Sequence, residues 1–132
     1  MSTKVAVIGS RDYANQAQVR AYVRTLPKDT LLVSGGAIGV DSWAVDEAHK
    51  CGLATPIVIK PDYSGKAAWE RKRAPLERNL LIVAEATRVV GFWSGTASSR
   101  GTVHALHHAI KLGKLIEAYG EDGSNWDLKH FK

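Results

Sequence analysis

Two glycine-rich stretches with hydroxyl side chains are the parts of this 132-residue sequence that could bind an anion. The first is Ser34-Gly35-Gly36-Ala37-Ile38-Gly39-Val40-Asp41, which follows a short apolar run. Glycine lets the backbone turn sharply and approach a ligand, and the amides of a following helix's first turn point outward with the positive end of the dipole. A ligand-free turn between a strand and a helix is the alternative. We expect a phosphate or a similar anion at Ser34, Gly35, Gly36 and Gly39.

The second stretch extends from Ser94 to Thr102. Ser98, Ser99 and Thr102 supply hydroxyls, Gly101 opens the next helix, and Arg100 can form a bidentate pair with a phosphate or carboxylate. A solvated loop cation is the alternative for Arg100. Two anion sites that face each other would suit a nucleotide, a dinucleotide or a strand of nucleic acid. Neither stretch matches the Walker A or Gly-x-Gly-x-x-Gly pattern, which argues against a P-loop hydrolase or an ordinary NAD dehydrogenase.

Carboxylates near these turns could take part in cleavage of a glycosidic bond, which needs an acid close to the developing oxocarbenium centre. The weak candidates are Asp41, Glu70 and Glu77. Asp41 more simply anchors its glycine turn through local hydrogen bonds. Glu70 and Glu77 have the spacing of surface ion pairs with Arg73 on one helix. No catalytic residue is therefore assigned.

Other reactive side chains give weaker signals. His104 and His108 have the i,i+4 spacing of a zinc pair, but no glutamate accompanies them and no third ligand is evident, so we expect no metal and no resident cofactor. Cys51 is the single cysteine and cannot form an intramolecular disulfide. Trp93 ends a strand beside the second stretch, where it could stack on a purine, although tryptophan more often packs in a core.

The elements that must position these residues alternate between strand and helix. Continuous apolar runs predict strands at 5–8, 30–33, 56–59, 88–93 and 114–118, and 3.6-residue periodicity predicts helices between them. Pro75 should split the helical region 66–86 into two pieces, and a further helix covers 103–112. This order predicts one domain over residues 1–132, an α/β Rossmann-like three-layer sandwich with a five-stranded, mainly parallel sheet. Ligands of such sheets bind outside the carboxyl ends of the strands, where Gly9, Ser10, Arg11 and the segment 60–62 would join both glycine stretches.

Four motifs together resemble a known superfamily. Gly9-Ser10-Arg11, the Ser34–Asp41 string, Arg78-Asn79 and Ser99-Arg100-Gly101-Thr102, in this order, look like the YspA-like branch of the SLOG superfamily, and the resemblance covers nearly the whole chain. It implies a Rossmann-like fold that binds a nucleotide or a nucleotide-derived small molecule, and a homo-oligomer. Relatives sense such molecules in bacterial and phage conflict systems.

Two better understood families also resemble parts of the chain. The DNA-processing protein family has a similar Ser-Gly-x-Ala-x-Gly-x-Asp string and a later Arg-Asn, and binds single-stranded DNA on that face. This resemblance implies contacts to a nucleic-acid backbone from Ser34, Gly35, Gly36, Gly39, Arg78 and Asn79. The "lonely guy" phosphoribohydrolases carry a catalytic glutamate shortly after a Gly-Thr pair. Here Gly101-Thr102 is followed by Val103, His104 and Ala105, so the glutamate is absent at the matching position, which argues against this hydrolase activity.

The charge favours partners that carry phosphate. There are 18 Lys and Arg against 13 Asp and Glu, a net charge of +5, and the helical region 66–86 is rich in cations. The single cysteine and a start that lacks a signal peptide's long apolar region predict a cytosolic protein. No apolar run approaches the roughly 20 residues that a membrane span needs, so we expect no membrane partner. The sequence favours a nucleotide-binding protein first, a single-stranded nucleic-acid binder second and an N-glycosidase acting on nucleoside monophosphates third. The cations of the helical region 66–86 could instead form an ordinary solvent-exposed helix face with no bound partner. They are Lys66, Arg71, Lys72, Arg73 and Arg78.

Overall fold

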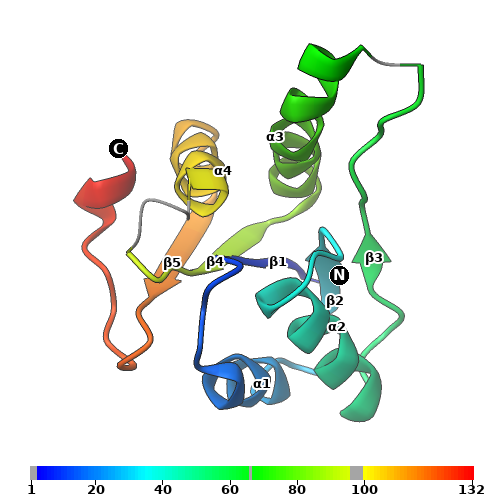
Figure 1. Cartoon of the computed structure of the whole chain (residues 1–132). Coiled ribbons are helices and arrows are strands. Elements are labelled where there is room, and N and C mark those ends of the chain that lie inside the picture. The colour runs from blue at the N-terminus through cyan, green and yellow to red at the C-terminus, as the bar shows by residue number, and fades with distance from the viewer. Residues whose placement is uncertain (1–2, 66, 96–99) are drawn as a thin grey trace.

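A five-stranded sheet with all four strand pairs parallel forms the centre of the computed structural model, which describes residues 3–65, 67–95 and 100–132 (Figure 1). The strand order is β3-β2-β1-β4-β5, so β1 lies in the middle and the order reverses beside it. This confirms the predicted Rossmann-like α/β class. The strands are β1 (Lys4–Gly9), β2 (Leu31–Ser34), β3 (Ile57–Val58), β4 (Arg88–Phe92) and β5 (Leu115–Tyr119).

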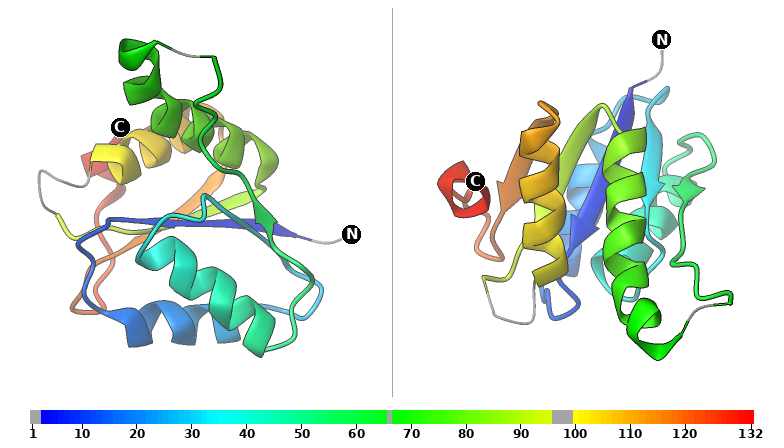
Figure 2. Two further views of the ribbon diagram at one scale, coloured as in Figure 1. Left: turned by 45° about the vertical axis from the view of Figure 1, so that its right-hand side comes forward. Right: turned by 90° about the horizontal axis from the view of Figure 1, so that it is seen from above.

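Helices cover both faces of the sheet, which completes the predicted three layers (Figures 1 and 2). One pair packs on one face and the other pair on the opposite face. None of the helices described is both long and apolar enough to cross a membrane. The first pair is α1 (Gln16–Arg24) and α2 (Val40–Lys50), and the second is α3 (Ala68–Glu85) and α4 (Arg100–Lys111).

Each face of the sheet has its own apolar core. Val5 and Val7 of β1 pack toward α1 and α2, whereas Ala6 and Ile8 pack toward α3 and α4. Because successive strand side chains point to opposite faces, a strand that is covered twice must be apolar at every position. This explains the unbroken apolar run of β1, whose four central residues are all buried.

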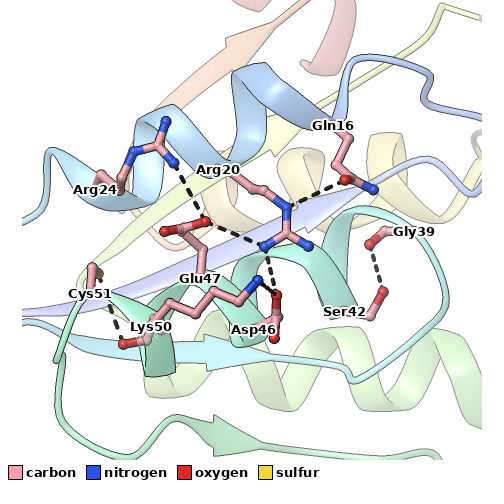
Figure 3. Close-up of polar contacts among 10 residues, drawn as sticks. Gln16, Arg20, Arg24, Gly39, Ser42, Asp46, Glu47, Lys50 and Cys51 are labelled. Carbon is pink, nitrogen blue, oxygen red and sulfur yellow. Dashed lines mark hydrogen bonds and ion pairs between the residues drawn. The ribbon is translucent and has the colours of Figure 1, made fainter.

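A network of ion pairs joins α1 to α2 on the outside of the first layer (Figure 3). Arg20 lies 2.7 Å from the Asp46 carboxylate and 3.3 Å from that of Glu47. Arg24 adds a second pair to Glu47 at 3.5 Å, and Lys50 lies 3.1 Å from Asp46. Glu47 is buried, so its charge is compensated by two guanidinium groups rather than by water.

The predicted break at Pro75 is wrong, because α3 is continuous from Ala68 to Glu85 with Pro75 inside it. A proline removes one bond of the helical ladder, and the amides that follow it still find their partners. Ala74, Ile82 and Val83 are buried on either side of this position. Their packing keeps α3 continuous although one backbone hydrogen bond is lost at Pro75.

The predicted start of the fourth helix is also corrected. Arg100, Gly101 and Thr102 belong to α4 and not to the preceding loop. Thr102 is buried in this first turn of α4.

The C-terminal segment ends in the short 3-10 helix η2 (Leu128–Phe131). Its Phe131 is buried in the core of the α3 and α4 face, so this segment packs tightly against the domain.

Candidate functional site

A groove lies at the carboxyl edge of the sheet and consists of two adjoining cavities. The inner cavity, of about 140 Å³, lies between the end of β1, α3 and the start of α4. The outer cavity, of about 450 Å³, lies between the glycine turn before α2, the loop after β3 and α3. The two share four lining residues, Arg11, Ala37, Pro75 and Arg78, and are therefore treated as one groove.

The structure brings most of the predicted residues to this groove. The inner cavity is lined by Gly9, Ser10, Arg11, Asp41, Arg78, Asn79, Gly101 and Thr102 among others. Gly35 and Gly36 line the outer cavity. The glycine turn before α2 and the start of α4 thus meet at one edge of the sheet.

The turn from Ser34 to Asp41 uses some of its own amides. The Gly36 amide donates to Ser34 Oγ at 3.2 Å, and the Ala37 amide donates to Asp41 Oδ2 at 3.3 Å. Within this turn, the amides of Gly36 and Ala37 are therefore bonded to side chains of the turn itself. The physical reason is proximity, because the carboxylate in the first turn of α2 lies within reach of the turn that precedes it.

The environment of Asp41 is unusual for a carboxylate. Asp41 is 7% exposed, and burial raises its pKa to about 6, although the Ala37 amide, the Arg78 guanidinium and the Gly35 amide all favour the charged form. Desolvation outweighs three favourable contacts. Its carboxylate anchors the glycine turn, which was the simpler of the two roles considered for it.

Arg78 and Asn79 lie on the side of α3 that faces the groove. Arg78 Nη1 donates to the Gly35 carbonyl at 2.9 Å, and its Nε donates to Asn79 Oδ1 at 2.9 Å. Asn79 Nδ2 in turn donates to the Gly101 carbonyl at 3.3 Å. Desolvation lowers the pKa of Arg78, while the nearby Asp41 opposes this shift and Arg11 adds to it.

The residues after β1 have different roles. Ser10 is buried, and its hydroxyl accepts a hydrogen bond from the Ser94 amide at 3.2 Å, which ties the end of β1 to the end of β4. Ser94 also donates to Asp12 at 2.8 Å. Arg11 is exposed and lines both cavities. Arg11 is thus the residue of this segment best placed to meet an anion.

Several predicted residues do not line either cavity in the part of the chain that the structure describes. Arg100 is exposed in the first turn of α4 but is not part of the groove wall, and Ser98 and Ser99 lie outside the described residues. The weak catalytic candidates Glu70 and Glu77 are not in the groove wall either. Glu70 instead accepts a hydrogen bond from the Ala67 amide at the start of α3.

The suggestion that Trp93 stacks on a ligand is corrected. Its ring packs against Trp126, with the ring centres 4.5 Å apart, and against Phe131 at 5.2 Å. The Trp126 indole also donates to the Trp93 carbonyl at 3.0 Å. The C-terminal segment thus covers Trp93, which packs against the core, the alternative stated for this tryptophan.

Sequence reasoning missed other parts of the groove. Tyr63 and Pro75 line the outer cavity, beside Lys60 and Pro61, which were expected at this edge of the sheet. Pro75 lies three residues before Arg78, so helical spacing alone places both on one face of α3. Across the described residues, no three His, Cys, Asp or Glu side chains are grouped closely enough to hold a metal ion.

The fold and the groove together define a Rossmann-like α/β domain with a cationic groove at the carboxyl edge of its sheet. Residues 1–87 match the model of the DNA recombination-mediator protein A family, and this chain belongs to that family. The SLOG superfamily and its YspA-like branch stay a prediction.

The structure is similar to the X-ray structure of DNA processing protein A (DprA) from Streptococcus pneumoniae, with a TM-score of 0.73 and 21% sequence identity. The similarity covers 96% of this chain and 52% of that chain, so this chain spans about half the length of that protein. At this identity the similarity concerns the fold. No curated protein matches this chain.

Proposed function

We propose that this chain binds single-stranded nucleic acid along the groove. The observation that carries the proposal is the convergence of three cations from three segments, since Arg11 and Arg78 line both cavities and Lys60 lines the outer one. Among the described residues that line the groove, Asp41 is the single acid, and its carboxylate is bonded to its own turn. The groove is therefore suited to a chain of phosphates.

The placement of Arg11 near Arg78 supports an anionic ligand. Two positive charges that face one cavity repel each other, and an arriving phosphate relieves that repulsion. Arg71 and Lys72 are exposed and lie about one helical turn before Pro75 and about two turns before Arg78, so they extend the positive charge along α3. A recessed groove favours a flexible single strand over a rigid duplex, because the single strand can bend into it.

Membership of this family also supports the binding of nucleic acid. The matched family is described as a DNA recombination mediator, and the similar solved structure is described as a DNA processing protein. We extend DNA binding to this chain on that basis, together with the charges of its own groove.

Fluorescence anisotropy with a labelled oligo(dT) tests this function. We expect binding that weakens steeply as salt rises, with log K falling by about 0.7 per log unit of salt for each phosphate neutralised. Arg11→Ala should lower the affinity and make this slope about 0.7 less negative. Lys111→Ala is the matched control, because Lys111 is an exposed cation at the far end of α4. Absence of binding at low salt, or equal effects of the two variants, would contradict the proposal.

A free nucleotide is the second candidate. It is favoured by the inner cavity, where Gly9 and the buried Ser10 and Thr102 lie at the point at which the strand order reverses. Pockets for small ligands usually have volumes of about 300–1,000 Å³, so a nucleotide would need both cavities. Competition separates the two functions: a nucleoside monophosphate that displaces oligo(dT) at micromolar concentration favours the nucleotide, and displacement only at millimolar concentration favours the nucleic acid.

A further inference from the structure

The outer cavity has apolar walls that phosphate contacts do not require. Ile38 is 87% exposed and Tyr63 is 47% exposed, and both line this cavity. A single exposed apolar side chain is ordinary on a protein surface. Here a bulky aliphatic side chain and an aromatic ring border one cavity, together with Pro61 and Pro75.

The loop that carries Tyr63 is held by hydrogen bonds on both sides of the ring. Before it, the Ile59 amide donates to the Ser34 carbonyl at 2.8 Å and continues the pairing of β3 with β2. After it, the Ser64 amide donates to Asp62 Oδ1 at 2.9 Å, which forms a tight turn around Tyr63. An aromatic side chain on an ordered loop loses little conformational entropy when a ligand binds.

The part of the wall that carries Ile38 is fixed by the close approach of the glycine turn to β3. Gly36 has a φ of 69°, and a Cβ at this position would lie 2.8 Å from Val58 Cγ1. Only glycine allows this approach without strain. Ile38 follows two residues later, and both the turn that presents Ile38 and the loop that presents Tyr63 border the cavity.

The chemistry of this cavity matches one unit of a nucleic acid. A nucleobase has two apolar faces and is attached to an anionic phosphate. The apolar walls are bordered by Lys60, Arg11 and Arg78, and a volume of about 450 Å³ lies within the usual range for small-ligand sites. Phosphate contacts alone would leave Tyr63 and Ile38 in water.

We propose that the outer cavity is a nucleobase subsite, in which a base stacks on the Tyr63 ring beside Ile38 while its phosphate lies against Arg11 and Arg78. This inference rests on the proposed function and adds to it a contact to the base. Because every base has a π-face, stacking of this kind accepts different sequences.

Two oligomers of equal length test the subsite by anisotropy, oligo(dA) and an abasic oligomer with the same phosphates. We expect the wild type to bind oligo(dA) about tenfold more tightly than the abasic oligomer. Tyr63→Ala should remove this preference without changing the affinity for the abasic oligomer, and Tyr63→Phe should keep it. Leu115→Ala is the matched control, since Leu115 is a 72% exposed side chain on the edge strand β5.

The outcomes separate the subsite from the proposed function. If the wild type binds both oligomers equally, or if Tyr63→Ala weakens both equally, the nucleobase subsite is overturned while nucleic-acid binding stands. If the wild type binds neither oligomer, nucleic-acid binding fails, and calorimetry with AMP and ribose 5-phosphate then decides the subsite on a free nucleotide. A preference for AMP that Tyr63→Ala abolishes supports the subsite, and no preference overturns it.

Discussion

The Arg78 guanidinium donates a 2.9 Å hydrogen bond to the Gly35 carbonyl, although 43 residues separate the two in the sequence. The next residue, Asn79, donates to the Gly101 carbonyl in the first turn of α4. Two consecutive residues of α3 therefore connect the glycine turn before α2 with the start of α4. These two segments belong to helical layers on opposite faces of the sheet. Both contacts are made by residues that line the groove.

Asn79→Ala should lower the free energy of unfolding by about 1–2 kcal/mol, because one half-buried amide loses a contact to Arg78 Nε and a contact to the Gly101 carbonyl. Urea denaturation measures this change. Gln16→Ala is the control, since Gln16 makes an exposed 3.4 Å contact with Arg20 and should have an effect below about 0.5 kcal/mol. Equal effects of the two variants would show that Asn79 does not hold α3 to α4.

The raised pKa of Asp41 predicts an unusual dependence of the free energy of unfolding on pH. Its pKa rises from 3.8 to about 6 on folding because burial disfavours the charged carboxylate. Between these two values the folded state binds more protons than the unfolded state, so the contribution of Asp41 to stability falls as pH rises through this window. Above pH 6 the ionised carboxylate costs up to about 3 kcal/mol relative to the protonated one.

Asp41→Asn removes this titration and keeps an oxygen that can accept from the Ala37 amide. The difference in unfolding free energy, variant minus wild type, should therefore increase as pH is raised from about 4 to about 7. Chemical denaturation at a series of pH values measures it, and the other carboxylates cancel because both proteins contain them. A difference that stays flat across this range would mean that the folded-state pKa of Asp41 is ordinary.

Gly9 is constrained by packing rather than by a ligand. A Cβ at Gly9 would lie 2.5–2.7 Å from three atoms of the Val40 side chain, and Val40 is buried at the start of α2. Because a β-branched side chain in a core cannot easily rotate away, Gly9→Ala should cost about 1–3 kcal/mol of stability. Thermal or urea unfolding measures the loss.

Gly101→Ala is the matched comparison for Gly9→Ala. A Cβ at Gly101 would lie 3.5 Å from Asn79 Nδ2, which is an ordinary contact, and alanine has the higher helix propensity. This variant should be neutral or more stable by up to about 1 kcal/mol. Destabilisation as large as that of Gly9→Ala would contradict the packing explanation.

The elements of the fold could be predicted because their signals are local. The apolar run of β1 and the glycine turn after β2 mark strand ends within a few residues, and the parallel order follows from the alternation of strands and helices. The same rule placed Gly9, Ser10 and Arg11 beside the glycine turn, since carboxyl ends of parallel strands share one edge. The predicted break of the helix at Pro75 was wrong because sequence reasoning considers only the hydrogen bond that proline removes. It does not include the tertiary packing that keeps α3 continuous.

By itself, the sequence determined which segments become strands and helices and which strand ends meet, because backbone periodicity and glycine conformations act over a few residues. Tertiary structure alone decided that the C-terminal segment covers Trp93, that burial raises the pKa of Asp41, and that Tyr63 borders the groove. The physical reason is that the direction and solvation of a side chain depend on neighbours that are distant in the sequence. Those neighbours assemble only when the layers pack.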